Sequence, residues 1–194
     1  MKFIIRLFSA LIITFSYIEL AYSKTTKIII FGDSLIAGYG LVVEDNFVNQ
    51  LKLKTIENKI NDVTLFNSGV SGETSTGLLN RYKWVLEDNY DGVIILIGAN
   101  DALRGIDPSL TSQNIEKILS YLKEKQIPTM LIGMKAPNNL GEIYVNEFNT
   151  IYPKLSKKYN TAYYPFFLKD VALKPSLNQR DMIHPNKKGV KIIV

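Results

Sequence analysis

The stretch KIIIFGDSL, residues 27–35, begins with a mostly apolar run and stops abruptly at Gly32-Asp33-Ser34. A short run rich in isoleucine predicts a buried strand, and the glycine permits a tight turn after it. Four similar runs follow along the chain. The predicted strands are residues 27–31, 63–66, 93–97, 129–132 and 162–164.

Helical patterns lie between several of these runs. Apolar residues recur with the spacing of one helix face, three and four residues apart. The predicted helices cover residues 78–86, 115–122 and 145–159. Strands that alternate with helices favour an α/β sandwich with a parallel sheet. We expect one domain over residues 24–194.

The composition excludes several kinds of site. The chain has 194 residues, 46% hydrophobic, with a formal net charge of +5, one histidine and no cysteine. The absence of cysteine excludes disulfides, thiolate metal sites and a cysteine nucleophile. A single histidine, His184, excludes a zinc site built from several imidazoles. The positive charge is not clustered, so we expect no nucleic-acid partner.

The N-terminal residues have the pattern of a targeting segment. Lys2 and Arg6 form a short basic region, residues 7–18 are mostly apolar, and Ala21 and Ser23 are small residues at the spacing read by a signal peptidase. We predict a signal peptide over residues 1–23, cleaved near Ser23, and therefore a periplasmic or secreted protein. An uncleaved N-terminal anchor is the alternative.

Polar segments follow the predicted strands. They are Gly32-Asp33-Ser34, residues 67–72 and residues 98–101; a fourth, residues 181–185, lies near the end of the chain. In an open α/β sheet, sites form beyond the carboxyl ends of the strands. We therefore expect these four segments to meet at one edge of the sheet.

Ser34 has four interpretations from the sequence: a turn residue, a helix cap, part of a phosphate cradle or a nucleophile. The phosphate cradle fits poorly, because Gly38-Tyr39-Gly40 is followed by Val43 where a dinucleotide fingerprint needs glycine. A nucleophilic serine needs a base and a group that orients it. His184 is the only imidazole, and Asp181 lies three residues before it. A structural role for this lone histidine is the alternative.

Acyl transfer also needs hydrogen-bond donors where the carbonyl oxygen becomes negative. The backbone N–H groups of Ser34 and Gly72 and the side-chain amide of Asn100 could supply them. Taken separately, Gly72 could be a turn glycine and Asn100 a capping residue. The order of all four segments favours the catalytic interpretation.

These segments resemble the four sequence blocks of the SGNH, or GDSL, hydrolase superfamily. The block residues are Ser34, Gly72, Asn100 and His184 with Asp181. The chain is also similar to the bacterial acyl-thioesterase I / lysophospholipase / arylesterase branch at residues 103–105, 152–155, 165–167 and 173–175. The resemblance implies a flavodoxin-like α/β/α sandwich with a five-stranded parallel sheet. It also implies a serine hydrolase with neither metal nor organic cofactor.

The substrate pocket is predicted from two loops. Leu103, Ile106 and Pro108 follow the Asn100-Asp101 pair, and Met134 and Pro137 follow the fourth predicted strand. These residues could line an apolar groove or simply cap the core. Arg104 and Lys135, beside them, could meet a lipid phosphate or be solvated.

The leading functional hypothesis is a serine esterase that acts on acyl esters or thioesters, including lipids, with transient contact with membrane lipid and a monomeric state. A carbohydrate or cell-wall O-acetylesterase of the same superfamily is one alternative. A non-catalytic binding protein on this fold is the other. The chain ends nine residues after Pro185, so we expect a short final helix of two or three turns at most.

Overall fold

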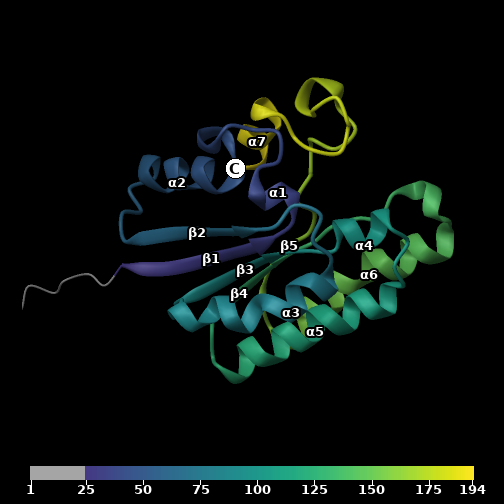
Figure 1. Cartoon of the computed structure of the whole chain (residues 1–194), viewed down its shortest axis with the longest axis horizontal. Coiled ribbons are helices and arrows are strands. Elements are labelled where there is room, and N and C mark those ends of the chain that lie inside the picture. The colour runs from purple at the N-terminus through teal and green to yellow at the C-terminus, as the bar shows by residue number, and fades with distance from the viewer. Residues whose placement is uncertain (1–24) are drawn as a thin grey trace, which may run out of the picture.

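The computed structural model describes residues 25–194 and contains one five-stranded sheet (Figure 1). All neighbouring strands are parallel, in the order β2-β1-β3-β4-β5. Their bounds are β1 Thr26–Gly32, β2 Val63–Gly69, β3 Gly92–Leu96, β4 Thr129–Ile132 and β5 Ala162–Tyr164. The five predicted strands and the α/β fold class are confirmed. The predicted signal peptide lies outside the described residues.

One strand boundary differs substantially from the prediction. β2 continues through Asn67 and Ser68 to Gly69, where a loop was expected. The reason is tertiary, because β2 pairs with β1 along its whole length and Gly69 lies opposite Gly32. Backbone pairing with a central strand therefore extends β2 past its last apolar residue.

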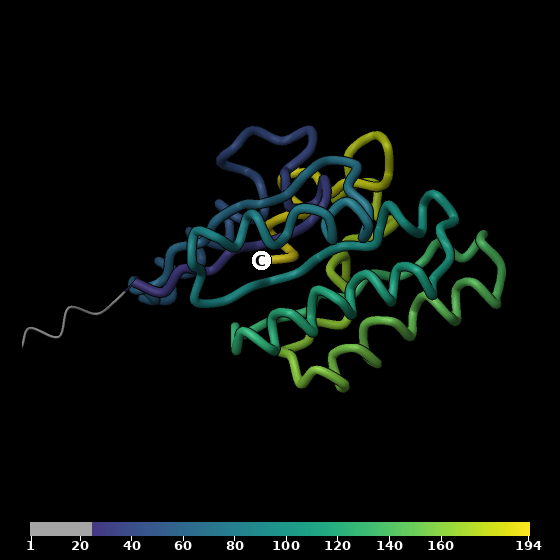
Figure 2. Tube along the Cα trace, turned by 60° about the horizontal axis from the view of Figure 1, so that its bottom comes forward, coloured from purple at the N-terminus to yellow at the C-terminus, as the bar shows by residue number. Residues whose placement is uncertain are grey.

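Helices cover both faces of the sheet, which makes a three-layer sandwich. The short α1, α2 and α7 lie on one face, and α3, α5 and α6 lie on the other (Figure 1). Figure 2 shows the two longest helices, α5 and α6, running side by side. The bounds are α1 Ser34–Ala37, α2 Phe47–Glu57, α3 Ser75–Val85, α4 Ala99–Leu103, α5 Pro108–Glu124, α6 Glu142–Tyr159 and α7 Lys187–Ile193, with 3₁₀ turns at Val43–Asp45, Leu86–Asp88, Asn138–Leu140 and Pro175–Leu177.

The three predicted helices correspond to α3, α5 and α6, whereas α2 was not predicted. Its apolar pattern is weak, since Phe47 and Val48 are buried but Leu53 and Ile56 face solvent. Asn46 caps this helix by accepting a hydrogen bond from the Asn49 N–H at 2.9 Å. Because two of its apolar residues are exposed, this helix lacks the single apolar face by which a helix is predicted from sequence.

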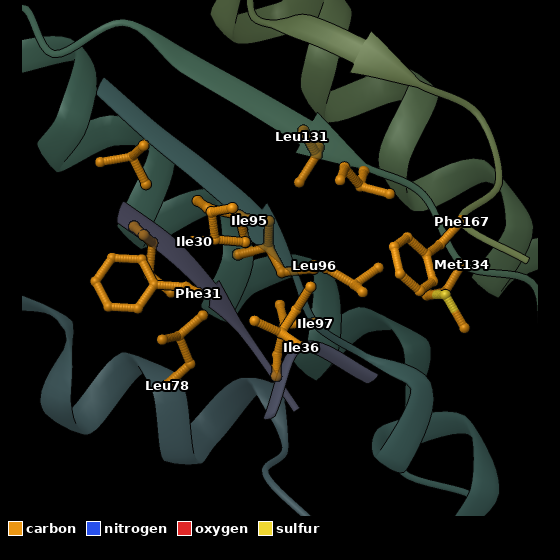
Figure 3. Packing of buried hydrophobic residues seen from close by; sticks show 14 of the residues in the cluster. Ile30, Phe31, Ile36, Leu78, Ile95, Leu96, Ile97, Leu131, Met134 and Phe167 are labelled. Atoms are coloured by element: carbon orange, nitrogen blue, oxygen red, sulfur yellow. The ribbon is translucent and has the colours of Figure 1, made fainter. Parts of the chain in front are cut away.

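The core lies on both sides of the central strands. Phe31, Ile95 and Leu96 are fully buried, and Leu131 extends the core towards β4 (Figure 3). Burial on both faces explains why these strands read as continuous apolar runs rather than alternating ones. This apolar sheet holds the carboxyl ends of β1, β2 and β3 at one level, because Gly32 lies opposite both Gly69 and Leu96.

The C-terminal segment is anchored despite the short length of α7. Asn186 caps α7 by accepting hydrogen bonds from the backbone N–H groups of Lys188 and Gly189. Val190 is buried, and α7 packs against α2. Lys187 also forms an ion pair with Asp45 at 3.0 Å. The loop before α7 is therefore tied to the face of the sheet that carries α1 and α2.

Candidate active site

Ser34 stands where β1 turns into α1. Asp33 is the N-cap residue, and its Oδ1 accepts a hydrogen bond from the Leu35 N–H at 3.0 Å. The turn needs a glycine at position 32, because a Cβ there would lie 2.8 Å from the carbonyl oxygen of Leu96. As the first residue of a helix, Ser34 has a backbone N–H without an acceptor inside that helix. Ser34 also lines a cavity of about 210 Å³.

The predicted base and its partner meet Ser34 from the other end of the chain. Ser34 Oγ lies 2.8 Å from His184 Nε2, and His184 Nδ1 lies 2.7 Å from Asp181 Oδ2. The other oxygen of Asp181 accepts hydrogen bonds from the backbone N–H groups of Ile183 and His184. The structure thus brings Ser34, His184 and Asp181 into one hydrogen-bonded chain.

The environment of Asp181 favours its ionised form. Partial burial alone would raise the pKa of Asp181, but hydrogen bonds from the backbone and ring of His184 and from the Ile183 N–H lower it to about 2. A carboxylate that stays ionised at neutral pH can orient the imidazole and stabilise the imidazolium.

A series of hydrogen bonds connects the segment that carries Ser34 to the segment that carries His184. The Tyr39 N–H donates to the carbonyl oxygen of Ser34 at 3.1 Å, and the Tyr39 carbonyl accepts from Gln179 Nε2 at 2.7 Å. Gln179 in turn donates its backbone N–H to the carbonyl oxygen of His184 at 2.8 Å. The Tyr39 ring packs against the His184 ring with 4.7 Å between centroids. Neither Tyr39 nor Gln179 was predicted as a site residue, because their contacts join segments about 140 residues apart.

The two remaining block residues open onto the same cavity as Ser34 and His184. This cavity of about 210 Å³ is lined by Ser34, Gly72, Asn100 and His184, among others. Gly72 lies in the turn before α3 with a φ of +80°, and its carbonyl accepts from Arg104 Nη2 at 2.8 Å. Asn100 is the second residue of α4, whose N-cap is Gly98, so it is not a capping residue.

Buried polar contacts support the segments that carry Gly72 and Asn100. Asp101 is fully buried and accepts from the Ser75 N–H at 2.8 Å and from Thr111 Oγ1 at 3.1 Å. Glu73 forms a two-point ion pair with Arg81, with nitrogen–oxygen distances of 2.6 and 2.7 Å. The sequence assigned no role to these residues, although Asp101 belongs to the polar segment 98–101. The only signal in the sequence is that polar residues directly follow the two blocks.

A second, larger cavity of about 570 Å³ adjoins the first. Leu103, Met134 and Pro137 line it, as predicted, together with residues such as Ala172 and Leu173. Ile106 and Pro108 line neither this cavity nor the smaller one. The carbonyl of Ile106 accepts from the Tyr144 hydroxyl, and Pro108 is buried as the first residue of α5. The structure therefore places these two residues away from both cavities, because α5 begins at Pro108.

The two basic side chains beside this cavity, Arg104 and Lys135, make different contacts. Arg104 is engaged with the Gly72 carbonyl, whereas Lys135 lines the larger cavity and stacks over the ring of Phe166 at 5.2 Å. Within residues 25–194, no group of three or more His, Cys, Asp or Glu side chains is arranged to hold a metal ion.

Residues 30–192 match the model of the GDSL-like lipase/acylhydrolase family. An arylesterase from Vibrio mimicus is 34% identical over 182 residues, which cover 93% of this chain and 90% of that protein. The thioesterase 1/protease 1/lysophospholipase L1 of Escherichia coli K12 is 36% identical over 161 residues, covering 82% and 76%. The crystal structure of AlinE4, an SGNH-hydrolase family esterase, superposes with a TM-score of 0.78 at 41% identity and covers 88% of this chain and 92% of that one.

The chain therefore belongs to the GDSL-like lipase/acylhydrolase family. The predicted family and the predicted enzyme class, an ester hydrolase, are confirmed.

Proposed function

We propose that the protein hydrolyses acyl esters and thioesters through an acyl-enzyme formed on Ser34. The observation that carries this proposal is the hydrogen-bonded chain from Ser34 Oγ through His184 to Asp181. His184 Nε2 takes the Ser34 proton as Oγ attacks the acyl carbon, and Asp181 holds the imidazole in the tautomer that can accept it. This proton transfer needs no rearrangement of the two side chains, because Ser34 Oγ and His184 Nε2 already lie at a hydrogen-bond distance of 2.8 Å.

The negative oxygen of the tetrahedral intermediate needs donors in the same cavity. We assign this role to the backbone N–H groups of Ser34 and Gly72 and to the Asn100 amide. His184 then gives its proton to the departing alcohol or thiol. Water repeats the sequence, with His184 as base, and releases the carboxylic acid and free Ser34.

The acyl group we propose is longer than acetyl. The larger cavity adjoins the smaller one that contains Ser34, because the two share the lining residues Ala99, Leu103 and Met134. Its wall is mainly apolar, which stabilises a hydrocarbon chain by removing it from water. An O-acetylesterase would have no use for this second cavity.

The test is a series of nitrophenyl esters from acetyl to long acyl chains, with Ser34→Ala as the blank. We expect kcat/KM to rise with chain length up to the length that fills the larger cavity, because each added methylene buries more apolar surface. A maximum at acetyl would favour the O-acetylesterase. Equal rates for the protein and the blank would favour the non-catalytic alternative.

A cavity-filling variant sharpens this test. Ala172 lines the larger cavity but not the smaller one. Ala172→Phe should lower kcat/KM on the preferred long-chain ester by about tenfold and leave acetyl ester hydrolysis within about twofold, because lost methylene contacts cost about tenfold or more. Equal losses on both esters would contradict a role for this cavity in acyl binding.

We also propose that residues 1–23 direct export and are removed. Among residues 25–194, the structure has no helix with the length and apolar character needed to cross a membrane. We expect the exported protein to begin at Lys24, as measured by its intact mass and N-terminal sequence. A full-length protein retained with the membrane would instead support the uncleaved anchor.

A further inference from the structure

Asp33 is a buried carboxyl group that the proposed mechanism does not use. Its side chain lies next to the nucleophile, and the residue is only 1% exposed. Oδ1 accepts from the Leu35 N–H, which caps α1. Oδ2 accepts from Asn100 Nδ2 at 3.3 Å, across 67 residues of sequence. Capping of α1 accounts for the contact with Leu35, and a serine could perform it as well. Capping does not account for the contact with Asn100.

Retaining this carboxyl group costs stability. Burial raises the pKa of Asp33 to about 6, and it outweighs the Leu35 hydrogen bond, the charge of His184 and the contact with Asn100. The other titratable groups that face it are Glu73, which is paired with Arg81, and Tyr152. Because the folded-state pKa lies above the ordinary value of 3.8, the folded protein loses stability as the pH rises from about 4 to about 6. A group kept at such a cost invites a functional explanation.

The contact restricts how the Asn100 amide can point. An asparagine side chain has an oxygen and an NH₂ group that occupy nearly the same space. An ionised carboxylate accepts hydrogen bonds but cannot donate them. Only the NH₂ group of Asn100 can therefore face Asp33, and a flipped amide would set its oxygen against the carboxylate. With one N–H on Asp33, the second N–H of the same nitrogen remains for the cavity.

We propose that Asp33 is a positioning residue that sets the orientation of the Asn100 amide, so that an N–H rather than the carbonyl oxygen is presented to the developing oxyanion. This inference rests on the proposed role of Asn100. It gives the aspartate before the nucleophile a task separate from capping α1.

The main variant is Asp33→Asn, measured for both activity and thermal stability. Its side-chain oxygen can still cap α1, but its NH₂ group then faces the NH₂ of Asn100, so the required orientation is lost. We expect kcat to fall by about tenfold or more, up to the 10²–10³-fold loss expected when this donor is removed, with little change in KM, since one of three oxyanion donors is misaligned. The melting temperature should rise by about 2–6 °C at pH 8, because a buried charge is removed, and the rise should shrink as the pH falls towards 4. A merely structural role predicts that activity and stability fall together.

A double-mutant cycle with Asn100→Ala shows whether Asp33 acts through Asn100. In that background Asp33→Asn should change kcat by less than about twofold. The same loss in both backgrounds would overturn the proposal and point to the charge near His184. An unchanged kcat in the single variant would also overturn it.

Asp33→Ser is the second variant, for the case that the asparagine variant folds poorly. Serine retains the cap but offers Asn100 no carboxylate, so the same loss of kcat is expected. Full activity of Asp33→Ser would contradict the proposal. Failure of the proposed function itself is distinguishable, because hydrolysis by the unaltered protein would then not depend on Ser34.

Discussion

Replacing Ser34 with alanine is expected to lower kcat on a nitrophenyl ester by about 10⁴–10⁶-fold. The variant retains the proposed oxyanion donors and the cavity but lacks the oxygen that we propose forms the acyl-enzyme. His184→Ala should cost a similar factor, because an unassisted serine hydroxyl is a weak nucleophile at neutral pH. The double variant should be no worse than either single one, since both residues act in one step. Initial rates of the three purified variants test this.

Ser71→Ala is the matched control for Ser34→Ala. Ser71 lies in the same cavity, one residue before Gly72. It should keep most of the activity, because the imidazole of His184 is hydrogen-bonded to Ser34. Circular dichroism should show the same fold for all variants. Activity losses that multiply in the double variant would contradict the assignment of Ser34 and His184 to one catalytic unit.

Asn100→Ala is expected to lower kcat by about 10²–10³-fold while KM changes little. In the proposed mechanism the amide stabilises the negative charge that develops in the transition state, and it contributes less to binding of the neutral ester. The same variant leaves Asp33 Oδ2 without its donor, so a modest loss of stability should accompany the loss of rate. Steady-state kinetics on the preferred ester and a thermal melt measure both effects.

Asn139→Ala is the control for this variant, because Asn139 is exposed and borders only the larger cavity. Its kcat should stay within about twofold of the unaltered protein. A raised KM with unchanged kcat for Asn100→Ala would contradict the oxyanion role and indicate a substrate-binding one.

Much of the fold could be predicted because it depends on local pattern. The apolar runs at 27–31 and 93–97 favour buried strands, because they are short, rich in β-branched residues and followed by glycine. The helices α5 and α6 likewise carry one apolar face each. The helix α2 lacks such a face, and its placement depends on packing against β2 and α7.

Three of the five predicted pocket residues line the larger cavity, and the other two lie away from it for a common reason. Leu103, Met134 and Pro137 lie at the ends of elements that face the cavity. Ile106 and Pro108 follow Leu103 closely in sequence, but Pro108 is already the first residue of α5. Proximity in sequence does not establish a shared cavity when a new helix begins in between.

By itself, the sequence determined which chemistry is available: a serine at a glycine turn, one imidazole with a carboxylate three residues away, and an amide after the third strand. Residue type and local spacing suffice for that, because each of these features is contained in a few neighbouring residues. Only the tertiary structure decided that Ser34 and His184 lie 2.8 Å apart, that Gln179 ties their segments together, and that Asp33 is buried against Asn100. Such contacts depend on parallel pairing and core packing across the whole chain, and no local pattern encodes a distance between residues 150 positions apart.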